Sequence, residues 1–122
     1  MTFITIDGDD IGRRLAACYL SNNVEALRST KELVERNTQQ ISEFLEKLGY
    51  DVLFCAADGV TAYTSDNALD KRNLYQSIKD IAGDELAFSV GIGSTLKEAY
   101  VALLFAKSTG KARICSFDSM EP

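Results

Sequence analysis

The order of predicted strands and helices along the chain, given by two kinds of hydrophobic pattern, limits its fold more than any other sequence feature. Short alternating or β-branched apolar runs predict strands, and apolar residues at i, i+3 and i+4 predict amphipathic helices. The predicted strands cover residues 2–6, 50–56, 60–65, 86–93 and 112–117. A loop and a short helix are predicted over residues 9–20, and longer helices over residues 22–49, 67–83 and 95–110. The order is therefore strand, two helices, two strands, helix, strand, helix, strand.

Local signals at the element boundaries agree with this order. Gly49 and Gly110 are suited to end helices, and Thr95 with Glu98 forms the capping-box pattern that begins one. The Ala-Asp-Gly tripeptide at residues 57–59 is short enough only for a tight turn. The two strands that flank it are therefore expected to form a hairpin.

This order matches the ferredoxin-like plan of an α+β domain, extended by a helix and a strand at its end. The plan predicts a mostly antiparallel sheet with helices on one face. The chain has 122 residues, 46% of them apolar, which is enough to bury one core. We therefore expect a single domain over residues 1–122.

The composition excludes several classes of function. The chain has no histidine, so Ser-His-Asp and Cys-His catalysis are excluded. Its formal net charge of −5 argues against a general DNA-binding protein. The three cysteines form no Cys-X-X-Cys pair, and no apolar run has the length of a signal peptide or a membrane span. We expect a cytoplasmic protein with reduced thiols and no membrane contact.

Three aspartates, Asp7, Asp9 and Asp10, follow directly on the first predicted strand. In the ferredoxin-like plan this strand lies beside the hairpin, so Asp58 in the hairpin turn falls at the same edge of the sheet. Carboxylates gathered in this way repel one another unless a cation lies between them. Mg²⁺ in proteins is commonly held by one or two carboxylates together with substrate phosphates. The acidic edge therefore predicts a site for Mg²⁺ or Mn²⁺ and a nucleoside triphosphate.

Glycines and lysines near this edge are consistent with a phosphate site. Gly8 and Gly12 would let the backbone approach phosphate oxygens closely. The helix that follows would direct its first backbone amides toward them. Lys107 and Lys111, near the end of the last predicted helix, are candidate phosphate ligands.

Each of these features also has a purely structural explanation. Asp9 and Asp10 would serve as N-caps of the helix after them. Asp58 before a glycine is common in hairpin turns. Lys107 and Lys111 would complement the dipole at a helix C-terminus. The functional interpretation depends on the combination, because the two acidic turns fall at one predicted edge.

Three stretches of the sequence together resemble palm-domain nucleotide polymerases and cyclases. TIDGDDIG, at residues 5–12, resembles the aspartate-bearing strand of GGDEF diguanylate cyclases and of type III CRISPR cyclases. CAADGV, at residues 55–60, stands where those families carry GGDEF or GGDD. The stretch at residues 88–114 is similar to the tail of GGDEF domains. The short chain looks most like the minimal CRISPR polymerases, and GTP cyclohydrolase III is a second small palm relative.

The resemblance implies a role for each residue of the candidate site. The metal ligands would be Asp7, the backbone carbonyl of Gly8, and Asp58, with Asp9 as an auxiliary ligand or a helix cap. The phosphate contacts would come from the first loop and the last helix, through Asp10, Ile11, Gly12, Lys107 and Lys111.

The hairpin turn departs from the GGDEF pattern. Ala56 and Ala57 stand in place of its two glycines, and Gly59 in place of its second acidic residue. Diguanylate cyclases normally keep both acidic residues, so that activity is disfavoured. Related nucleotidyl cyclases function with one acidic residue in this turn.

The resemblance implies a metal-dependent nucleotidyltransferase that makes a cyclic di- or oligonucleotide from ATP and releases pyrophosphate. Because one palm holds one donor nucleotide, ring closure implies a homodimer with its acidic edges opposed. The family also implies prokaryotic antiviral signalling, in which the product controls a separate effector protein. Two alternatives remain open, a GTP-ring-opening hydrolase like GTP cyclohydrolase III and a degenerate palm that binds a nucleotide without turning it over.

Overall fold

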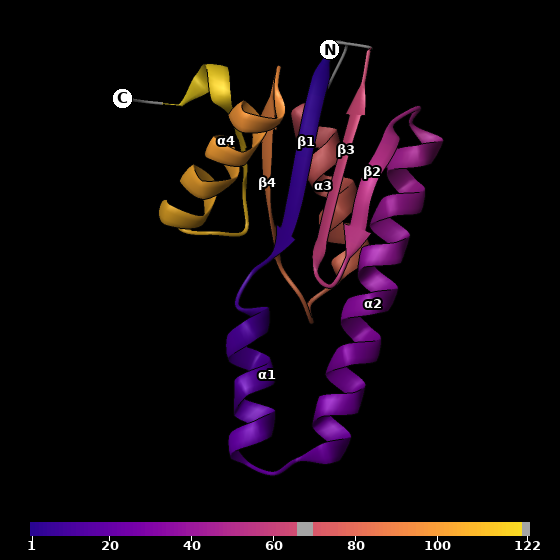
Figure 1. Ribbon diagram of the computed structural model, residues 1–122, viewed down its shortest axis with the longest axis vertical. Coiled ribbons are helices and arrows are strands. Elements are labelled where there is room, and N and C mark those ends of the chain that lie inside the picture. Colours follow the sequence, from indigo (N-terminus) through magenta and orange to yellow (C-terminus); the bar gives the residue numbers. More distant parts are fainter. Residues whose placement is uncertain (66–69, 121–122) are drawn as a thin grey trace.

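The computed structural model describes residues 1–65 and 70–120. These residues form five strands and four α-helices in the predicted order (Figure 1). The strands are β1 (Thr2–Gly8), β2 (Asp51–Ala56), β3 (Gly59–Thr64), β4 (Phe88–Gly93) and β5 (Ile114–Ser116). The helices are α1 (Ile11–Leu20), α2 (Val24–Lys47), α3 (Lys71–Ala82) and α4 (Leu96–Ser108), followed by the short 3₁₀ helix η1 (Phe117–Ser119). The predicted helix start at residues 67–69 lies outside the described residues.

The five strands form one sheet in the order β2-β3-β1-β4-β5. The central strand β1 pairs antiparallel with β3 and β4, whereas β5 is parallel to β4. The mostly antiparallel sheet and the β2–β3 hairpin are therefore confirmed. The register places Asp7 of β1 opposite Gly59, the first residue of β3. The C-terminal end of β1 and the hairpin turn consequently lie at the same edge of the sheet.

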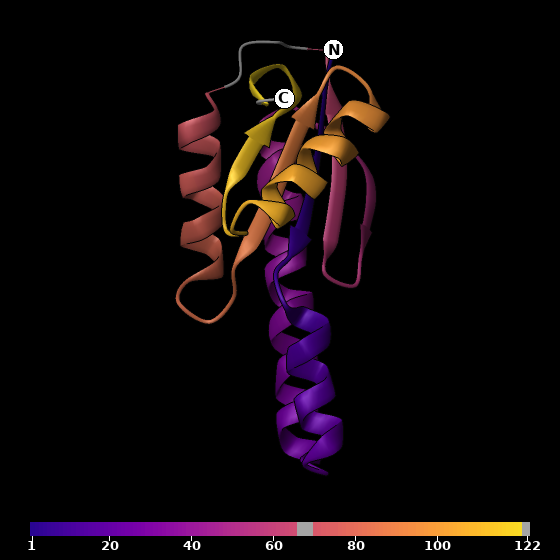
Figure 2. The same cartoon turned by 90° about the vertical axis from the view of Figure 1, so that its left-hand side faces the viewer.

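Beyond this edge, α1 and the first half of α2 extend as a helical hairpin (Figures 1 and 2). Asn23 caps α2, because its side-chain oxygen accepts a hydrogen bond from the backbone N–H of Ala26 at 3.0 Å. The second half of α2 returns along the sheet and packs on β2 and β3. Among the described residues, no helix combines the length and the apolar character needed to cross a bilayer.

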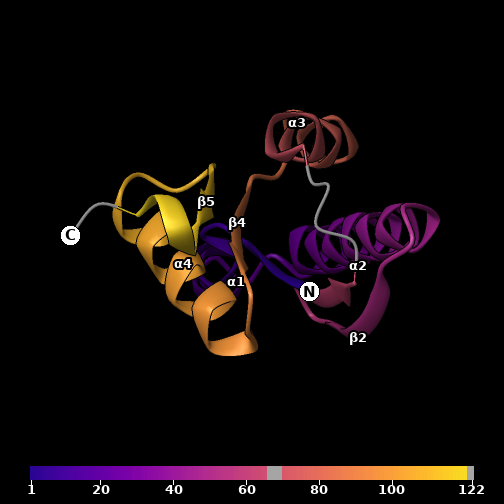
Figure 3. The same ribbon diagram turned by 90° about the horizontal axis from the view of Figure 1, so that it is seen from above.

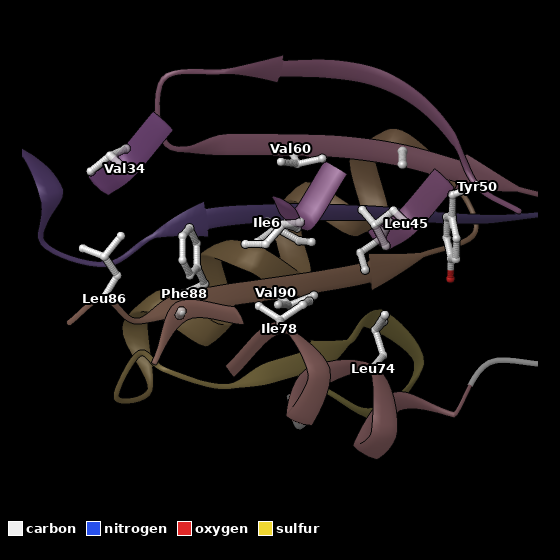
Figure 4. Close-up of a cluster of buried hydrophobic side chains, with 14 of the residues drawn as sticks. Ile6, Val34, Leu45, Tyr50, Val60, Leu74, Ile78, Leu86, Phe88 and Val90 are labelled. Carbon is white, nitrogen blue, oxygen red and sulfur yellow. The ribbon is translucent and has the colours of Figure 1, made fainter. Parts of the chain in front are cut away.

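The main hydrophobic core lies between the sheet and the helices α2 and α3 (Figure 3). Ile6 and Val90, on the neighbouring strands β1 and β4, are at most 1% exposed. They pack in one cluster with Leu45 of α2 and Ile78 of α3 (Figure 4). Because alternate strand residues point to opposite faces, Ile4 joins the same cluster as Ile6.

The helix α4 covers the opposite face of the sheet, so the expectation that the helices lie on one face is wrong (Figure 3). Gly91 and Gly93 of β4 alternate with the core residues and therefore point toward α4. A Cβ atom at Gly91 would lie 2.2 Å from the carbonyl oxygen of Ala99, and one at Gly93 would lie 2.6 Å from the Ala99 nitrogen. The two glycines thus allow the backbone of α4 to approach β4 closely, and α4 gains its own buried contact with the sheet.

The face that carries α4 is only partly covered. α4 packs chiefly on β4, and within the described residues no helix lies in front of β3 and β2, which are on the other side of β1 (Figure 1). On this open half, the ring of Phe3 on β1 stacks on that of Tyr63 on β3, with centroids 5.5 Å apart. Phe54 of β2 pairs with a β3 residue of the same face and is 55% exposed. Asp7 shares this face with Phe3, so the acidic edge borders the open half.

Candidate active site

The end of β1 meets the hairpin turn through a backbone hydrogen bond. The N–H of Gly8 donates to the carbonyl oxygen of Asp58 at 3.0 Å. A Cβ atom at Gly8 would lie 3.2 Å from Oδ2 of Asp58 and 2.7 Å from a side-chain carbon of Ile11. A Cβ atom at Gly59 would lie 3.7 Å from Oδ1 of Asp7. The structure therefore brings together the predicted pair Asp7 and Asp58, and only glycine fits between Asp58 and Ile11.

The two carboxylates are electrostatically unfavourable to each other. Burial raises the pKa of the Asp58 carboxyl above its ordinary value, and the charge of Asp7 raises it further. The charge of Lys107 acts in the opposite direction and does not cancel the shift. An added cation at this edge would thus be stabilised by both carboxylates.

Lys107, in the last turn of α4, places its ammonium group over the end of β1. Its Nζ atom lies 2.8 Å from the carbonyl oxygen of Gly8, 2.9 Å from Oδ1 of Asp9 and 3.2 Å from Oδ2 of Asp7. Burial lowers the pKa of this lysine, but the hydrogen bond to Asp9 and the charges of Asp7 and Asp9 raise it, and the net shift is upward. Lys107 is therefore charged at neutral pH.

The Asp9 side chain is only 4% exposed and accepts three hydrogen bonds. Oδ1 accepts from Oγ of Ser89 at 2.7 Å and from Lys107, and Oδ2 accepts from the backbone N–H of Ala112 at 2.9 Å. Neither predicted acid caps α1, since Asp10 occupies the N-cap position without a side-chain cap bond. The sequence analysis did not identify Ser89 as part of the site. The only sequence feature that pointed to it is that Ser89 is a small polar residue within the apolar run of β4.

The loop after α4 has an unusual backbone. Gly110, Lys111 and Ala112 all have positive φ values, of 128°, 62° and 47°. Lys111 reaches back to Asp10, with Nζ 2.6 Å from Oδ1, and this hydrogen bond lowers the pKa of Asp10. Asp10 itself has a φ of 60°. Left-handed backbone outside glycine is costly and is often found at functional sites, and here it brings Lys111 beside the first loop.

The remaining predicted residues begin α1. Ile11 is the first residue of this helix, and its side chain is buried in the core, so only its backbone can serve a ligand. Among the described residues, and apart from its chain neighbours and the backbone of its own helix, no atom lies within 4 Å of the position where a Cβ at Gly12 would lie, which leaves open space at the helix start. The helix begins next to the end of β1 (Figure 1). Its first amides are available to an anion at this edge.

Comparison with known proteins identifies the family. Residues 3–117 match the family model of the minimal CRISPR polymerase domain. The chain belongs to the minimal CRISPR polymerase family. No curated protein matches the chain.

Solved structures show the fold of this minimal CRISPR polymerase domain. The GGDEF domain of DgcB from Caulobacter crescentus, in complex with c-di-GMP, matches with a TM-score of 0.68 and 12% sequence identity. The match covers 97% of this chain and 78% of that one. The guanylyl cyclase Cya2 matches with a TM-score of 0.47 and 11% identity, over 75% of this chain and 52% of its own. The DgcB match confirms a ferredoxin-like palm fold, and the family marks a polymerase- or cyclase-like palm domain.

The donor atoms at the acidic edge suit Mg²⁺ better than a transition metal. Within residues 1–65 and 70–120, no three side chains of His, Cys, Asp or Glu are grouped to hold a metal ion. The edge instead offers two carboxylates, of Asp7 and Asp58, with the carbonyl oxygen of Gly8 close by. Mg²⁺ takes few protein oxygens and completes its octahedron with phosphates and waters. The residues present therefore fit such an ion together with a triphosphate.

Proposed function

We propose that this domain is a metal-dependent nucleotidyltransferase that joins ATP molecules into a cyclic di- or oligonucleotide and releases pyrophosphate. The observation that carries the proposal is the convergence of Asp7, Asp58, the Gly8 carbonyl and Lys107 at one edge of a palm sheet. Two carboxylates and a nearby cation suit in-line phosphoryl chemistry, in which positioning and charge neutralisation do most of the catalysis.

Each residue of the site then has a separate task. Asp7, Asp58 and the Gly8 carbonyl would hold Mg²⁺ or Mn²⁺. The bound ion would polarise the α-phosphate and favour ionisation of the attacking ribose hydroxyl. The backbone amides of Ile11 and Gly12 would bind phosphate oxygens at the start of α1.

The two lysines would act on the leaving group, and the two remaining aspartates would hold the lysines in position. Lys107 and Lys111 would neutralise the charge that develops on pyrophosphate. Asp10 would hold Lys111 in place through their ion pair. Asp9 already accepts three hydrogen bonds, two on Oδ1 and one on Oδ2, which use most of the roughly four lone-pair sites of a carboxylate. We therefore assign Asp9 the task of positioning Lys107 and the loop at Ala112.

Ring closure from two nucleotides needs two such sites that face each other, so we propose a homodimer. The open half of the sheet is the surface that supports it, because it borders Asp7 and carries exposed apolar side chains. Phe54 is 55% exposed, and on the neighbouring α4 Tyr100 is 57% and Leu104 47% exposed. A second copy seated on this half would bring the two acidic edges toward each other.

Light scattering after size-exclusion chromatography tests the dimer. Leu104→Asp should convert a dimer into a monomer. Leu48→Asp changes a leucine of similar exposure, 53%, at the end of α2 and should leave the dimer intact. Monomeric wild-type protein at micromolar concentration would contradict the dimer.

The biological role is the part of the proposal that depends on family membership alone. We propose that the cyclic product acts on a separate effector protein in prokaryotic antiviral defence. We also propose a reducing, cytoplasmic location, consistent with the free thiols of Cys18, Cys55 and Cys115.

Mass spectrometry of the products tests the activity. The protein is incubated with each nucleoside triphosphate, and with their mixture, in Mg²⁺ or Mn²⁺. We expect a cyclic product and pyrophosphate from ATP. Asp7→Asn and Asp58→Asn should lower the rate by at least about 100-fold, because even residues that only support a metal ligand contribute 10- to 100-fold. Circular dichroism would verify that both variants are folded.

Other results would select another function. A ring-opened GTP product would indicate a hydrolase like GTP cyclohydrolase III. Nucleotide binding without any product would indicate a degenerate palm, which the alanines in the hairpin turn favour. Product formation by folded Asp7→Asn at the wild-type rate would refute the assignment of the site.

A further inference from the structure

The ammonium group of Lys107 already occupies oxygens that the proposed metal would need. Of its three neighbouring oxygens, the carbonyl oxygen of Gly8 at 2.8 Å and Oδ2 of Asp7 at 3.2 Å belong to proposed metal ligands. The third neighbour is Oδ1 of Asp9 at 2.9 Å. A lysine ammonium has three N–H donors, so these three acceptors use all of them. In this arrangement Lys107 has no donor left for a phosphate.

Lys107 and a divalent cation cannot hold the same oxygens together. Mg²⁺ binds oxygen at about 2.0–2.1 Å, so an ion on Gly8 and Asp7 would fill the space beside the ammonium group. Both groups carry positive charge, and the site is partly shielded from water, which strengthens their repulsion. Entry of an ion onto the Gly8 carbonyl oxygen and Oδ2 of Asp7 therefore requires Lys107 to leave these two atoms.

Asp9 supplies a fixed point about which Lys107 can move. Ser89, which is fully buried, and the backbone N–H of Ala112 hold the Asp9 carboxylate independently of the lysine. Lys107 can thus keep its bond to Asp9 while two of its N–H donors turn toward another anion. The phosphates of a nucleotide are the anions that the site is proposed to receive.

We infer that Lys107 is a resident counter-cation that excludes the divalent ion until a nucleotide arrives. The inference is a regulation of the proposed metal and nucleotide site and rests on that proposed function. Without nucleotide, Lys107 neutralises Asp7 and blocks the Gly8 carbonyl. With nucleotide, the triphosphate takes over the two released N–H donors, and the divalent ion takes the oxygens that Lys107 leaves. Metal and nucleotide therefore bind cooperatively, and the metal alone binds weakly.

Mn²⁺ binding to the nucleotide-free protein tests this exchange, with the free ion measured by electron paramagnetic resonance. Lys107→Met removes the competing ammonium group and should bind Mn²⁺ at least about tenfold more tightly than wild type. Lys111→Met is the matched control, because it removes the same charge nearby from a lysine that pairs with Asp10. It should change Mn²⁺ affinity by no more than about twofold, the range of an exposed, salt-screened charge.

A second readout uses stability and does not depend on metal affinity. In a metal-free buffer Lys107→Met should melt at a lower temperature than Lys111→Met, since it leaves Asp7 and Asp9 without their counter-charge. Added Mn²⁺ should raise the melting temperature of Lys107→Met by more than it raises that of wild type. If Lys107→Met does not fold, Lys107→Gln can be used instead. It also removes the positive charge but keeps a hydrogen-bond donor for Asp9.

The outcomes separate the exchange from the metal site itself. If Lys107→Met binds Mn²⁺ no more tightly than Lys111→Met, while Asp7→Asn abolishes binding, the exchange is refuted and the metal site stands. If no variant binds Mn²⁺ at millimolar concentration with or without nucleotide, both the exchange and the metal site are refuted. Tight binding to Lys107→Met alone supports the exchange.

Discussion

The close approach of α4 to β4 makes Gly91 the most demanding position of the sheet. In Gly91→Ala the new Cβ atom would lie 2.2 Å from the carbonyl oxygen of Ala99 and 2.3 Å from the nitrogen of Leu103. Both of these atoms are backbone, so no side-chain rotation relieves the clash. Ordinary contacts begin near 3.4 Å, and α4 would have to retreat by about 1 Å. A gap of that size forfeits a quarter to a half of the dispersion energy across the interface.

We expect Gly91→Ala to lower the free energy of unfolding by about 3 kcal/mol, at the upper end of typical overpacking costs. That is a large part of the roughly 5–15 kcal/mol that stabilises a small domain. Gly12→Ala is the matched control, because it makes the same chemical change in α1 where no atom lies within 4 Å. It should raise the free energy of unfolding by about 0.5–1 kcal/mol, the advantage of alanine over glycine in a helix.

Urea unfolding, followed by circular dichroism, measures both changes. The midpoints should move in opposite directions with the slopes unchanged, which would show that only stability differs. A Gly91→Ala protein within about 0.5 kcal/mol of wild type, the range of a harmless surface substitution, would refute the packing argument. So would a shift of both variants in the same direction.

Two further predictions concern the hairpin turn. Ala57 has a φ of 51°, a backbone region that costs a non-glycine residue about 1–2 kcal/mol. Ala57→Gly should therefore raise the free energy of unfolding by about 0.5–1 kcal/mol, after the entropy of glycine is deducted, whereas Ala56→Gly in β2 should lower it. Burial and the charge of Asp7 raise the pKa of Asp58 above its unfolded value, so the native state binds the proton more tightly. The stability that this group contributes is present at low pH and is lost as the pH rises through the raised pKa. In metal-free buffer, Asp58→Asn should melt at a higher temperature than wild type at pH 7, and the difference should shrink toward pH 3.

The order of elements was predictable because each element carries its own local signal. The capping box at Thr95 is an example, since its side chain accepts a hydrogen bond from the backbone N–H of Glu98 at 3.1 Å. The meeting of Asp7 with the Asp58 turn was also predictable. It follows from the antiparallel register of a hairpin beside the first strand, and no knowledge of side-chain packing is needed.

The placement of α4 and the details of the site were not predictable in this way. A helix that packs through Gly91 and the alanines of α4 has a weak apolar pattern, because small residues act by letting backbones approach. The predicted strand at residues 112–117 is shortened to three residues, because Ala112 is in the left-handed region at one end and the 3₁₀ helix η1 begins at Phe117 at the other. The partners of Asp9 lie 80 to 103 residues away along the chain, and no local pattern reveals them.

The bonds that join the end of β1 to α4 and its following loop have a consequence for the time at which the site forms. Lys107 and Ala112 contact Asp9 across 98 and 103 residues of a 122-residue chain. Contacts of such high sequence separation form late, because the entropy of closing the loop must be overcome first. During synthesis, which proceeds from the N-terminus, the acidic loop after β1 is made well before its lysine and can meet it only after residues as far as Lys107 have been made. A growing chain therefore lacks the assembled acidic edge until α4 and the loop that follows it have been made.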